Sequence, residues 1–208
     1  MKLKGLYLVT PEYTGPWIFS ATERALKSGV NVLQYRDKKS SFRKKLEIGR
    51  KLREMCREYG IPFIVDDDPV LMDILDADGI HIGKDDVPFS YVKSKFSGRI
   101  IGVSTYGNLE DAVKFQRLGA DYVAFGSFFN TQTKDDATMC DINILDGLDK
   151  INIPAFVIGG INRNNVALLL KYKISGIAVV SAIYSSRDIE TEVSYYLNIL
   201  KEYGIIKR

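Results

Sequence analysis

Two acidic stretches follow two short apolar runs near the middle of the chain. The acidic residues are Asp66, Asp67 and Asp68 after the run 63–65, and Asp85 and Asp86 after the run 79–82. Each run is rich in branched residues and bounded by turn formers, which is typical of a buried strand. Carboxylates at two neighbouring strand ends can hold a hard cation such as Mg²⁺. The alternative is that each aspartate caps a helix; acidic pairs at both ends favour the metal.

Three polar side chains alternate after another apolar run, at Gln34, Arg36 and Lys38. In extended backbone, alternate residues point to the same side. An amide, a guanidinium and an ammonium on one side can bind an anion, because Arg makes a two-pronged contact to phosphate and Lys adds a point charge. The basic residues that follow, from 39 to 45, are more typical of a solvated surface. We expect the alternating three to be functional.

The longest irregular stretch of the chain, 127–140, contains Thr131, Thr133 and Lys134. Long loops in compact domains are often lids or binding loops. Two hydroxyl groups and an ammonium group could cover a phosphate. A polar insertion without a binding role would have the same composition, so the loop by itself leaves both interpretations open.

A glycine pair, Gly159 and Gly160, follows the apolar run 155–158, and Val180 and Ser181 end the run 176–180. Glycines let backbone N–H groups approach a ligand, and the N-terminus of a following helix favours an anion. In many eight-stranded α/β barrels a phosphate site lies after the seventh and eighth strands. A tight turn also uses such a pair, but both halves at these positions favour phosphate binding.

His81 is the only histidine, and it lies within the run 79–82 rather than after it. We therefore interpret it as a buried core or near-core side chain rather than a catalytic base. A single histidine also excludes a multi-histidine metal site.

The elements that must position these residues alternate regularly along the chain. Strands are expected near 6–9, 32–33, 63–65, 79–82, 100–104, 122–126, 155–158 and 176–180. Helices are expected near 17–27, 41–59, 71–75, 89–96, 109–118, 144–150, 162–170 and 189–203, with Ser40 or Ser41 capping the second and Asn162 or Asn164 capping the seventh.

Eight strand signals that alternate with eight helix signals predict an α/β fold with a parallel sheet. The strands are nearly continuous apolar runs, as expected where both faces are covered. A single (β/α)₈ barrel domain over residues 1–208, with its active site at the C-terminal ends of the strands, is therefore predicted. The alternative is a doubly wound open sheet, and the absence of G-x-G-x-x-G after the first strand disfavours its dinucleotide-binding version.

Composition is that of an ordinary soluble protein, with 46% hydrophobic and 26% charged residues among 208. The net charge of +3 is too weak to indicate nucleic acid or a membrane surface as a partner. Cys56 and Cys140 lack metal-ligand spacing and are expected to be reduced thiols. No leader or membrane-spanning run is seen, so we expect a cytoplasmic location.

Taken together, these residues resemble the thiamine-phosphate synthase family over nearly the whole chain. The matching motifs, in chain order, are Gln34, Arg36 and Lys38; His81, Gly83 and Asp86; Gly102, Val103 and Ser104; Thr131, Thr133 and Lys134; and Gly159, Gly160 and Ile161. The family joins 4-amino-5-hydroxymethyl-2-methylpyrimidine diphosphate to hydroxyethylthiazole phosphate and releases pyrophosphate. The resemblance therefore implies a Mg²⁺-dependent transferase that acts on small phosphorylated substrates. A homo-oligomer is also possible.

The resemblance also implies roles for individual residues. Asp67 and Asp86 would bind Mg²⁺, and Ser104 would lie beside the pyrimidine and the leaving group. The diphosphate would be bound by Gln34, Arg36, Lys38 and Lys134, of which Arg36 and Lys134 would act in catalysis together with Ser104. The thiazole phosphate would be held by Thr131, Thr133, Gly160, Val180 and Ser181. Asp66 stands where the family usually has Asn, and would lie near the substrate or the metal.

Three other functions stay open from the sequence. A thiazole tautomerase would keep the barrel and the thiazole phosphate site, but it carries a catalytic His where this chain has Ser127. A catalytically degenerate, thiazole-phosphate-binding regulatory protein would be supported only by Asp66. Another phosphate-binding barrel, such as an isomerase or aldolase, would need a Glu, Lys or Cys inside the strand ends, and the sequence offers no convincing candidate.

Overall fold

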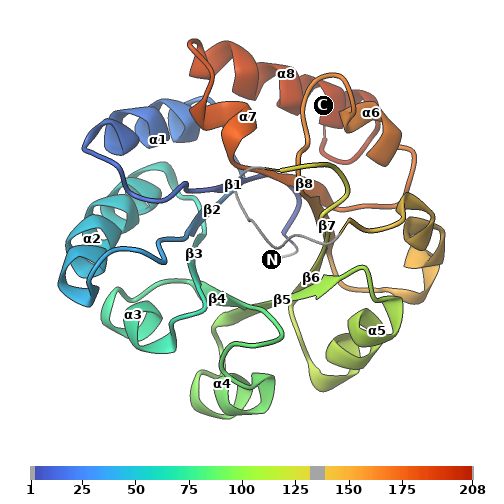
Figure 1. The fold of residues 1–208 in the computed structure, drawn as a ribbon, viewed down its shortest axis with the longest axis horizontal. Coiled ribbons are helices and arrows are strands. Elements are labelled where there is room, and N and C mark those ends of the chain that lie inside the picture. The colour runs from blue at the N-terminus through green and yellow to red at the C-terminus, as the bar shows by residue number, and fades with distance from the viewer. Residues whose placement is uncertain (1–2, 132–138, 208) are drawn as a thin grey trace.

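Eight parallel strands form a closed barrel in the computed structural model, which describes residues 3–131 and 139–207. The strands are β1 (Gly5–Val9), β2 (Val32–Tyr35), β3 (Phe63–Asp66), β4 (Gly79–Ile82), β5 (Ile100–Tyr106), β6 (Tyr122–Phe125), β7 (Ala155–Ile158) and β8 (Gly176–Val179). Each strand pairs with the next in sequence, and β8 pairs with β1 to close the barrel (Figure 1). The predicted (β/α)₈ barrel is confirmed, and the open sheet is excluded.

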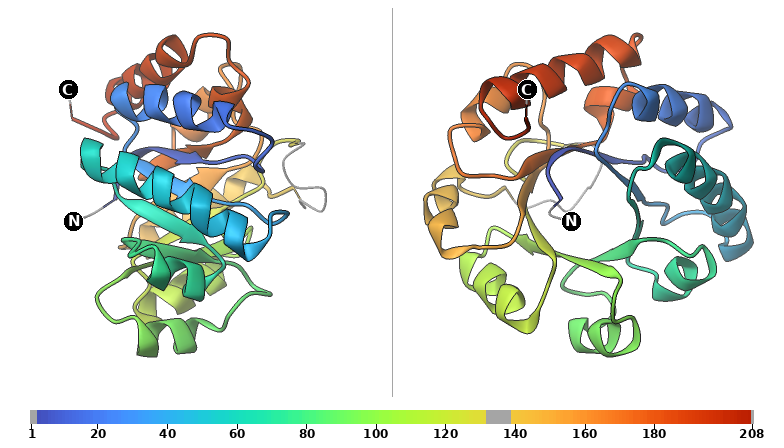
Figure 2. Two further views of the ribbon diagram at one scale, coloured as in Figure 1. Left: turned by 90° about the vertical axis from the view of Figure 1, so that its left-hand side faces the viewer. Right: turned by 180° about the vertical axis from the view of Figure 1, so that it is seen from behind.

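Helices surround this barrel on all sides, as the view from behind shows (Figure 2). The α-helices are α1 (Trp17–Lys27), α2 (Phe42–Tyr59), α3 (Pro69–Ile74), α4 (Phe89–Lys95), α5 (Leu109–Leu118), α6 (Val166–Leu169), α7 (Ser181–Tyr184) and α8 (Ile189–Glu202). Local chemistry explains their ends. In α2, Ser41 is the N-cap and accepts a hydrogen bond from the Lys44 amide, and Gly60 ends the helix in a left-handed conformation.

The structure corrects the sequence analysis in three connections. The segment expected as a helix near 144–150 is a 3₁₀ helix, Ile142–Lys150, with Asp141 as its N-cap. After β7 the chain enters a turn in which the side chain of Asn162 accepts from the Asn164 amide. The asparagine side chain thus stabilises a turn instead of capping a helix, and α6 begins only at Val166, with no side-chain cap.

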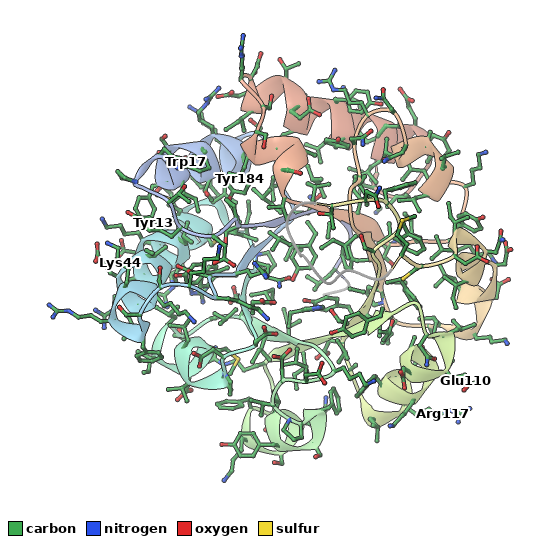
Figure 3. The ribbon with its side chains drawn as sticks, in the orientation of Figure 1. Tyr13, Trp17, Lys44, Glu110, Arg117 and Tyr184 are labelled. Carbon is green, nitrogen blue, oxygen red and sulfur yellow. The ribbon has the colours of Figure 1, made fainter. Side chains whose placement is uncertain are left out.

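The third difference is α7, a single helical turn that the sequence did not predict. It follows β8 directly and is too short to show a periodicity. Tyr184 at its end packs edge-on against Trp17 at the start of α1, with ring centroids 6.0 Å apart (Figure 3). The Tyr184 hydroxyl is also 2.8 Å from the Thr22 hydroxyl. Tertiary contact with α1 therefore stabilises α7.

Apolar residues form two layers on the two faces of the barrel wall. The larger layer lies between the strands and the helices, and the smaller one fills the barrel interior with Tyr7, Ile64, Tyr122 and Phe156 among its members. Gly102 makes room for Tyr122, because a Cβ at position 102 would lie 2.0 Å from a carbon of that ring. The interior is thus a packed core.

Candidate functional site

Opposite charges meet where β2 and β3 end. The amide of Gln34 donates to Asp66 at 2.5 Å, and the Arg36 Nε is 3.6 Å from the other carboxylate oxygen of Asp66. The Lys38 ammonium forms an ion pair with Asp67 at 2.6 Å. The structure thus places the three alternating side chains on one side, as the sequence predicted, and pairs each of them with an aspartate at the C-terminal end of β3.

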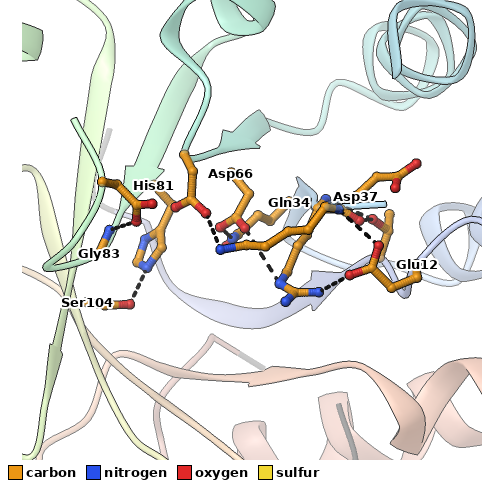
Figure 4. A network of polar contacts seen from close by, with 12 residues as sticks. Glu12, Gln34, Asp37, Asp66, His81, Gly83 and Ser104 are labelled. Atoms are coloured by element: carbon orange, nitrogen blue, oxygen red, sulfur yellow. Dashed lines mark hydrogen bonds and ion pairs between the residues drawn. The ribbon is translucent and has the colours of Figure 1, made fainter. Parts of the chain in front are cut away.

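Glu12 belongs to this network, although the sequence analysis did not identify it. Its carboxylate is 2.8 Å from the Arg36 Nη1 and accepts a hydrogen bond from the Lys38 backbone amide at 2.9 Å (Figure 4). Glu12 follows β1 by only three residues, so its position past a strand end was an available signal. Because Arg36 lies between Glu12 and Asp66, carboxylates fix the guanidinium from two sides.

The carboxylates of Asp66, Asp67 and Asp86 form an acidic cluster. Burial, and then the nearby charge of Asp67, raise the pKa of Asp66 to about 8, although Arg36 and Lys38 act in the opposite direction. Burial and a hydrogen bond with Asp67 also raise the pKa of Asp86. Burial alone would lower the pKa of Lys38, but its contact with Asp67 raises it above the usual value. A positive charge beside these carboxylates favours their ionised form, and Lys38 supplies one.

The two interpretations of the aspartates apply to different residues. Asp68 is the N-cap of α3 and accepts from the Leu71 amide at 2.9 Å, so the capping interpretation is right there. Asp86 instead accepts from the Gly83 amide at 2.7 Å within the loop after β4. Asp67 has a left-handed backbone with φ of 60°. A non-glycine residue adopts this conformation at a cost, and such strain often marks functional sites.

The donor atoms of the acidic cluster suit magnesium. Mg²⁺ is usually bound through one or two carboxylates together with water and substrate phosphates, and Asp67 and Asp86 offer two carboxylates. The Lys38 ammonium already occupies the position of a cation beside Asp67. Among residues 3–131 and 139–207, no group of three or more His, Cys, Asp and Glu side chains is placed so that it could hold a metal ion.

His81 is buried, as the sequence predicted, and both of its ring nitrogens have polar partners. Its Nε2 is 2.9 Å from the Ser104 hydroxyl, and its Nδ1 is 3.0 Å from the Tyr122 hydroxyl. Ser104 belongs to β5 and is partly buried. The family resemblance pointed to Ser104, but its contact with His81 could not be predicted from the sequence, because the two residues are on different strands.

The glycine pair after β7 lets another loop pack closely. A Cβ at Gly159 would lie 2.0 Å from the Ser127 hydroxyl, and one at Gly160 would lie 2.3 Å from the Asn130 carbonyl oxygen. Both glycines also have positive φ. The expected helix N-terminus beside the pair is absent, since α6 starts six residues later.

Of the remaining residues predicted to bind substrate, the structure describes some and not others. Val180 and Ser181 form the junction between β8 and α7. Thr131 is described and partly buried, whereas Thr133 and Lys134 lie outside the described residues. The roles of these five positions, like those of the other site residues, stay predictions.

Comparison with known proteins adds to this geometry. Residues 6–183 match the model of the family described as thiamine monophosphate synthase. The thiamine-phosphate synthase of Picrophilus torridus is 63% identical over 188 residues, which are 90% of this chain and 92% of that protein. The thiamine-phosphate synthase of Thermoplasma acidophilum is 48% identical and covers 91% and 89%. The solved structure of a thiamine phosphate pyrophosphorylase from Pyrococcus furiosus superposes with a TM-score of 0.88 at 34% identity, covering 97% of this chain and 98% of that one.

Proposed function

This chain belongs to the thiamine monophosphate synthase family, and from this relationship we propose that it joins 4-amino-5-hydroxymethyl-2-methylpyrimidine diphosphate to hydroxyethylthiazole phosphate. The products would be thiamine phosphate and pyrophosphate, and the reaction would depend on Mg²⁺. The similarity of whole sequences supports the activity as a synthase. The identities of the two substrates and the role of the metal are part of the proposal.

One observation supports the proposal most, namely the paired charges at the ends of β2 and β3. Gln34, Arg36 and Lys38 can all donate hydrogen bonds to an anion, and they lie directly against Asp66 and Asp67. A diphosphate with its counter-cation carries both signs of charge. Its anionic oxygens would match the donors, and its cation would match the carboxylates. Oxygen atoms of the diphosphate would contact the donors, and the carboxylates of Asp67 and Asp86 would hold Mg²⁺.

The chemistry of this site would be electrostatic. The bond between the methylene carbon and the diphosphate oxygen breaks, and its electron pair leaves with pyrophosphate. The aminopyrimidine ring stabilises the positive carbon, and the thiazole nitrogen then forms the new carbon–nitrogen bond, so no protein nucleophile is required. Arg36 and Lys38 would stabilise the growing negative charge more in the transition state than in the bound substrate. Magnesium, when bound, would add positive charge beside the departing diphosphate.

The thiazole phosphate would bind on the opposite side of the barrel mouth, after β6, β7 and β8. The close approach of segment 127–130 to Gly159 and Gly160 brings Thr131 toward the end of β7. We assign the phosphate to Thr131, Thr133 and the backbone at Gly160, Val180 and Ser181. Lys134 would approach the diphosphate from the same loop.

The alternative functions find less support in the structure. At the position of the tautomerase histidine, the Ser127 hydroxyl donates to the Phe129 carbonyl oxygen at 2.9 Å and stabilises the loop. Asp66, the only feature favouring a degenerate binder, accepts a hydrogen bond from Gln34 and pairs with Arg36, so it is part of the proposed diphosphate site. The free thiols of Cys56 and Cys140 agree with the proposed cytoplasmic location. Among the helices that the structure describes, each is too short or too polar to span a membrane.

The direct test is pyrophosphate release from the pyrimidine diphosphate, measured with and without the thiazole phosphate and with and without Mg²⁺. We expect release only when all components are present, in equal amount with thiamine phosphate, and its loss on chelation. Isomerisation of a thiazole phosphate without pyrophosphate release, followed in a separate assay, would instead indicate a tautomerase. Binding of the thiazole phosphate without either reaction would indicate a degenerate binder.

A further inference from the structure

We propose that a buried chain of hydrogen bonds, Tyr7–Tyr122–His81–Ser104, holds His81 with its proton on Nε2 and thereby makes Ser104 donate its own proton to the substrate. The inference rests on the proposed function, because it takes Ser104 to face the pyrimidine diphosphate. Tyr7, Tyr122 and His81 are then positioning residues that act through Ser104.

The chain crosses the barrel interior in three contacts. The hydroxyl groups of Tyr7 and Tyr122 are 2.7 Å apart. The Tyr122 hydroxyl is 3.0 Å from His81 Nδ1, and His81 Nε2 is 2.9 Å from the Ser104 hydroxyl. The four residues belong to β1, β6, β4 and β5 in that order. All three distances are in the normal range for hydrogen bonds, so the four groups form one continuous path.

Close packing keeps this path in place. Tyr7 is 2% exposed, Tyr122 is fully buried, and His81 is 7% exposed. The rings of His81 and Tyr122 are stacked with centroids 5.5 Å apart, and Phe156 packs edge-on against both tyrosines. Figure 4 shows the contact between His81 and Ser104 at the end of the polar network that contains Asp66. Because the interior is close-packed, the groups have little freedom to change partners.

Each phenol in the path keeps its proton. Burial raises the pKa of Tyr7 well above its usual value, and the neighbouring Tyr122 raises it further. Burial also raises the pKa of Tyr122. At neutral pH each of the two hydroxyl groups therefore has one proton to place, and a neutral His81 ring has one more.

The buried end of the path decides the direction in which these protons point. Within residues 3–131 and 139–207, the Tyr7 hydroxyl has only the Tyr122 hydroxyl as a partner. If Tyr122 donated to Tyr7, the hydroxyl proton of Tyr7 would be buried without an acceptor. If Tyr7 donates to Tyr122 instead, only a lone pair of the Tyr7 oxygen is left without a donor, which costs less free energy. Tyr7 therefore donates to Tyr122, and Tyr122 donates to His81 Nδ1.

The direction of the hydrogen bond at His81 Nδ1 also fixes the direction of the one between His81 and Ser104. Once Nδ1 of His81 accepts a hydrogen bond, the ring proton of the neutral imidazole is on Nε2 and is donated to the Ser104 oxygen. The Ser104 proton is then available to an acceptor atom of the pyrimidine diphosphate. A hydrogen bond fixed in this direction before the substrate arrives needs no reorganisation during the reaction.

The single histidine permits a direct test by NMR. In protein labelled with ¹⁵N-histidine, we expect Nε2 to carry the proton and Nδ1 to show the shift of a hydrogen-bonded acceptor. The substitution Tyr122→Phe should move the Nδ1 resonance toward the value of an unbonded nitrogen, whereas Tyr196→Phe, which changes a buried phenol on α8, should not. A proton on Nδ1, or an average of both tautomers, would overturn the proposal.

Kinetics test the effect on Ser104. We expect Tyr122→Phe to lower kcat for pyrophosphate release about tenfold, the effect of one hydrogen bond, with little change in KM for the thiazole phosphate. In a Ser104→Ala background the same substitution should have almost no further effect. Independent, multiplying effects would contradict the proposal, because the tyrosine would then act through general stability.

A second variant and a control variant distinguish a failure of the hydrogen-bond chain from poor folding or from a failure of the proposed function. If Tyr122→Phe folds poorly, Tyr7→Phe removes the far hydroxyl and should couple to Ser104→Ala in the same way, with a smaller loss of kcat. Tyr196→Phe serves as the control and should keep full activity. If the wild-type protein releases no pyrophosphate at all, the proposed function fails, but the NMR experiment still decides the direction of the hydrogen-bond chain.

Discussion

The Lys38 ammonium lies 2.6 Å from the Asp67 carboxylate, across the gap between the ends of β2 and β3. Lys38 is predicted to bind the diphosphate, and Asp67 is predicted to bind its magnesium ion. In the protein alone the two residues neutralise each other. When both ligands bind, Lys38 and Asp67 would therefore exchange partners: Asp67 would bind Mg²⁺, and Lys38 would bind the diphosphate.

The substitution Lys38→Met should change the affinities for the two ligands in opposite directions. Removing the ammonium that competes for Asp67 should strengthen Mg²⁺ binding to the free protein several-fold to about tenfold, and should weaken pyrophosphate binding by a similar factor. Isothermal titration with MgCl₂ and with pyrophosphate measures both. Lys39→Met, at an exposed neighbour, is the matched control. Weaker Mg²⁺ binding by Lys38→Met would contradict the exchange.

Arg36→Ala should separate the two halves of the site. Because Arg36 would stabilise the leaving group, we expect pyrophosphate release to slow by about 100-fold or more. Binding of thiazole phosphate should stay within about twofold of wild type, as measured by titration in the absence of the diphosphate. Arg43→Ala, an exposed cation at the start of α2, should leave both quantities unchanged. Equal loss of both quantities would show that Arg36 supports the whole mouth of the barrel.

Asp66→Asn should stabilise the protein. The buried carboxylate has a pKa of about 8, mainly because burial and the adjacent Asp67 disfavour its charge. An amide oxygen can still accept from Gln34, and Arg36 still has Glu12 as a partner. We expect the free energy of unfolding at pH 8 to rise by about 1–3 kcal/mol, measured by urea denaturation without metal. The control is Asp73→Asn, at an exposed position on α3. A loss of stability would show that the pair with Arg36 outweighs the cost of burial.

Cys56 should make stability depend on pH in the alkaline range. Its thiol is fully buried in α2, and burial raises its pKa to about 12. In the unfolded chain a thiol ionises near pH 8.5, at about its usual pKa. The unfolded state therefore loses its proton first, and the stabilising contribution falls as the pH rises from about 8.5 toward 12.

Two measurements check this expectation. The unfolding free energy of wild type should decline relative to that of Cys56→Ala as the pH rises from 8 to 10. At pH 8, iodoacetamide should label Cys140, which is only partly buried, much faster than Cys56 in the folded protein. Labelling of Cys56 at the rate seen in urea would refute the assignment.

The fold was predictable from the sequence because its signals are local. A buried parallel strand needs a short apolar run, and an amphipathic helix needs one apolar face, so the alternation of the two predicts the barrel. The same locality applies to part of the site. Gln34, Arg36 and Lys38 share a side because extended backbone has a period of two, and the acidic residues after β3 and β4 converge because neighbouring strands end together.

The tertiary structure alone decided which of these groups touch. Tyr7 and Tyr122 are 115 positions apart, yet their hydroxyls are in contact, because barrel closure directs both side chains into the interior. Glu12 reaches Arg36 because the paired strands β1 and β2 end side by side, and α7 depends on its packing against α1. Pairing across strands depends on register and side-chain packing, and no periodicity of a single segment encodes either one. The sequence by itself therefore determined the barrel and the kinds of groups at its mouth, whereas their partners, protonation and hydrogen-bond direction depend on the folded barrel.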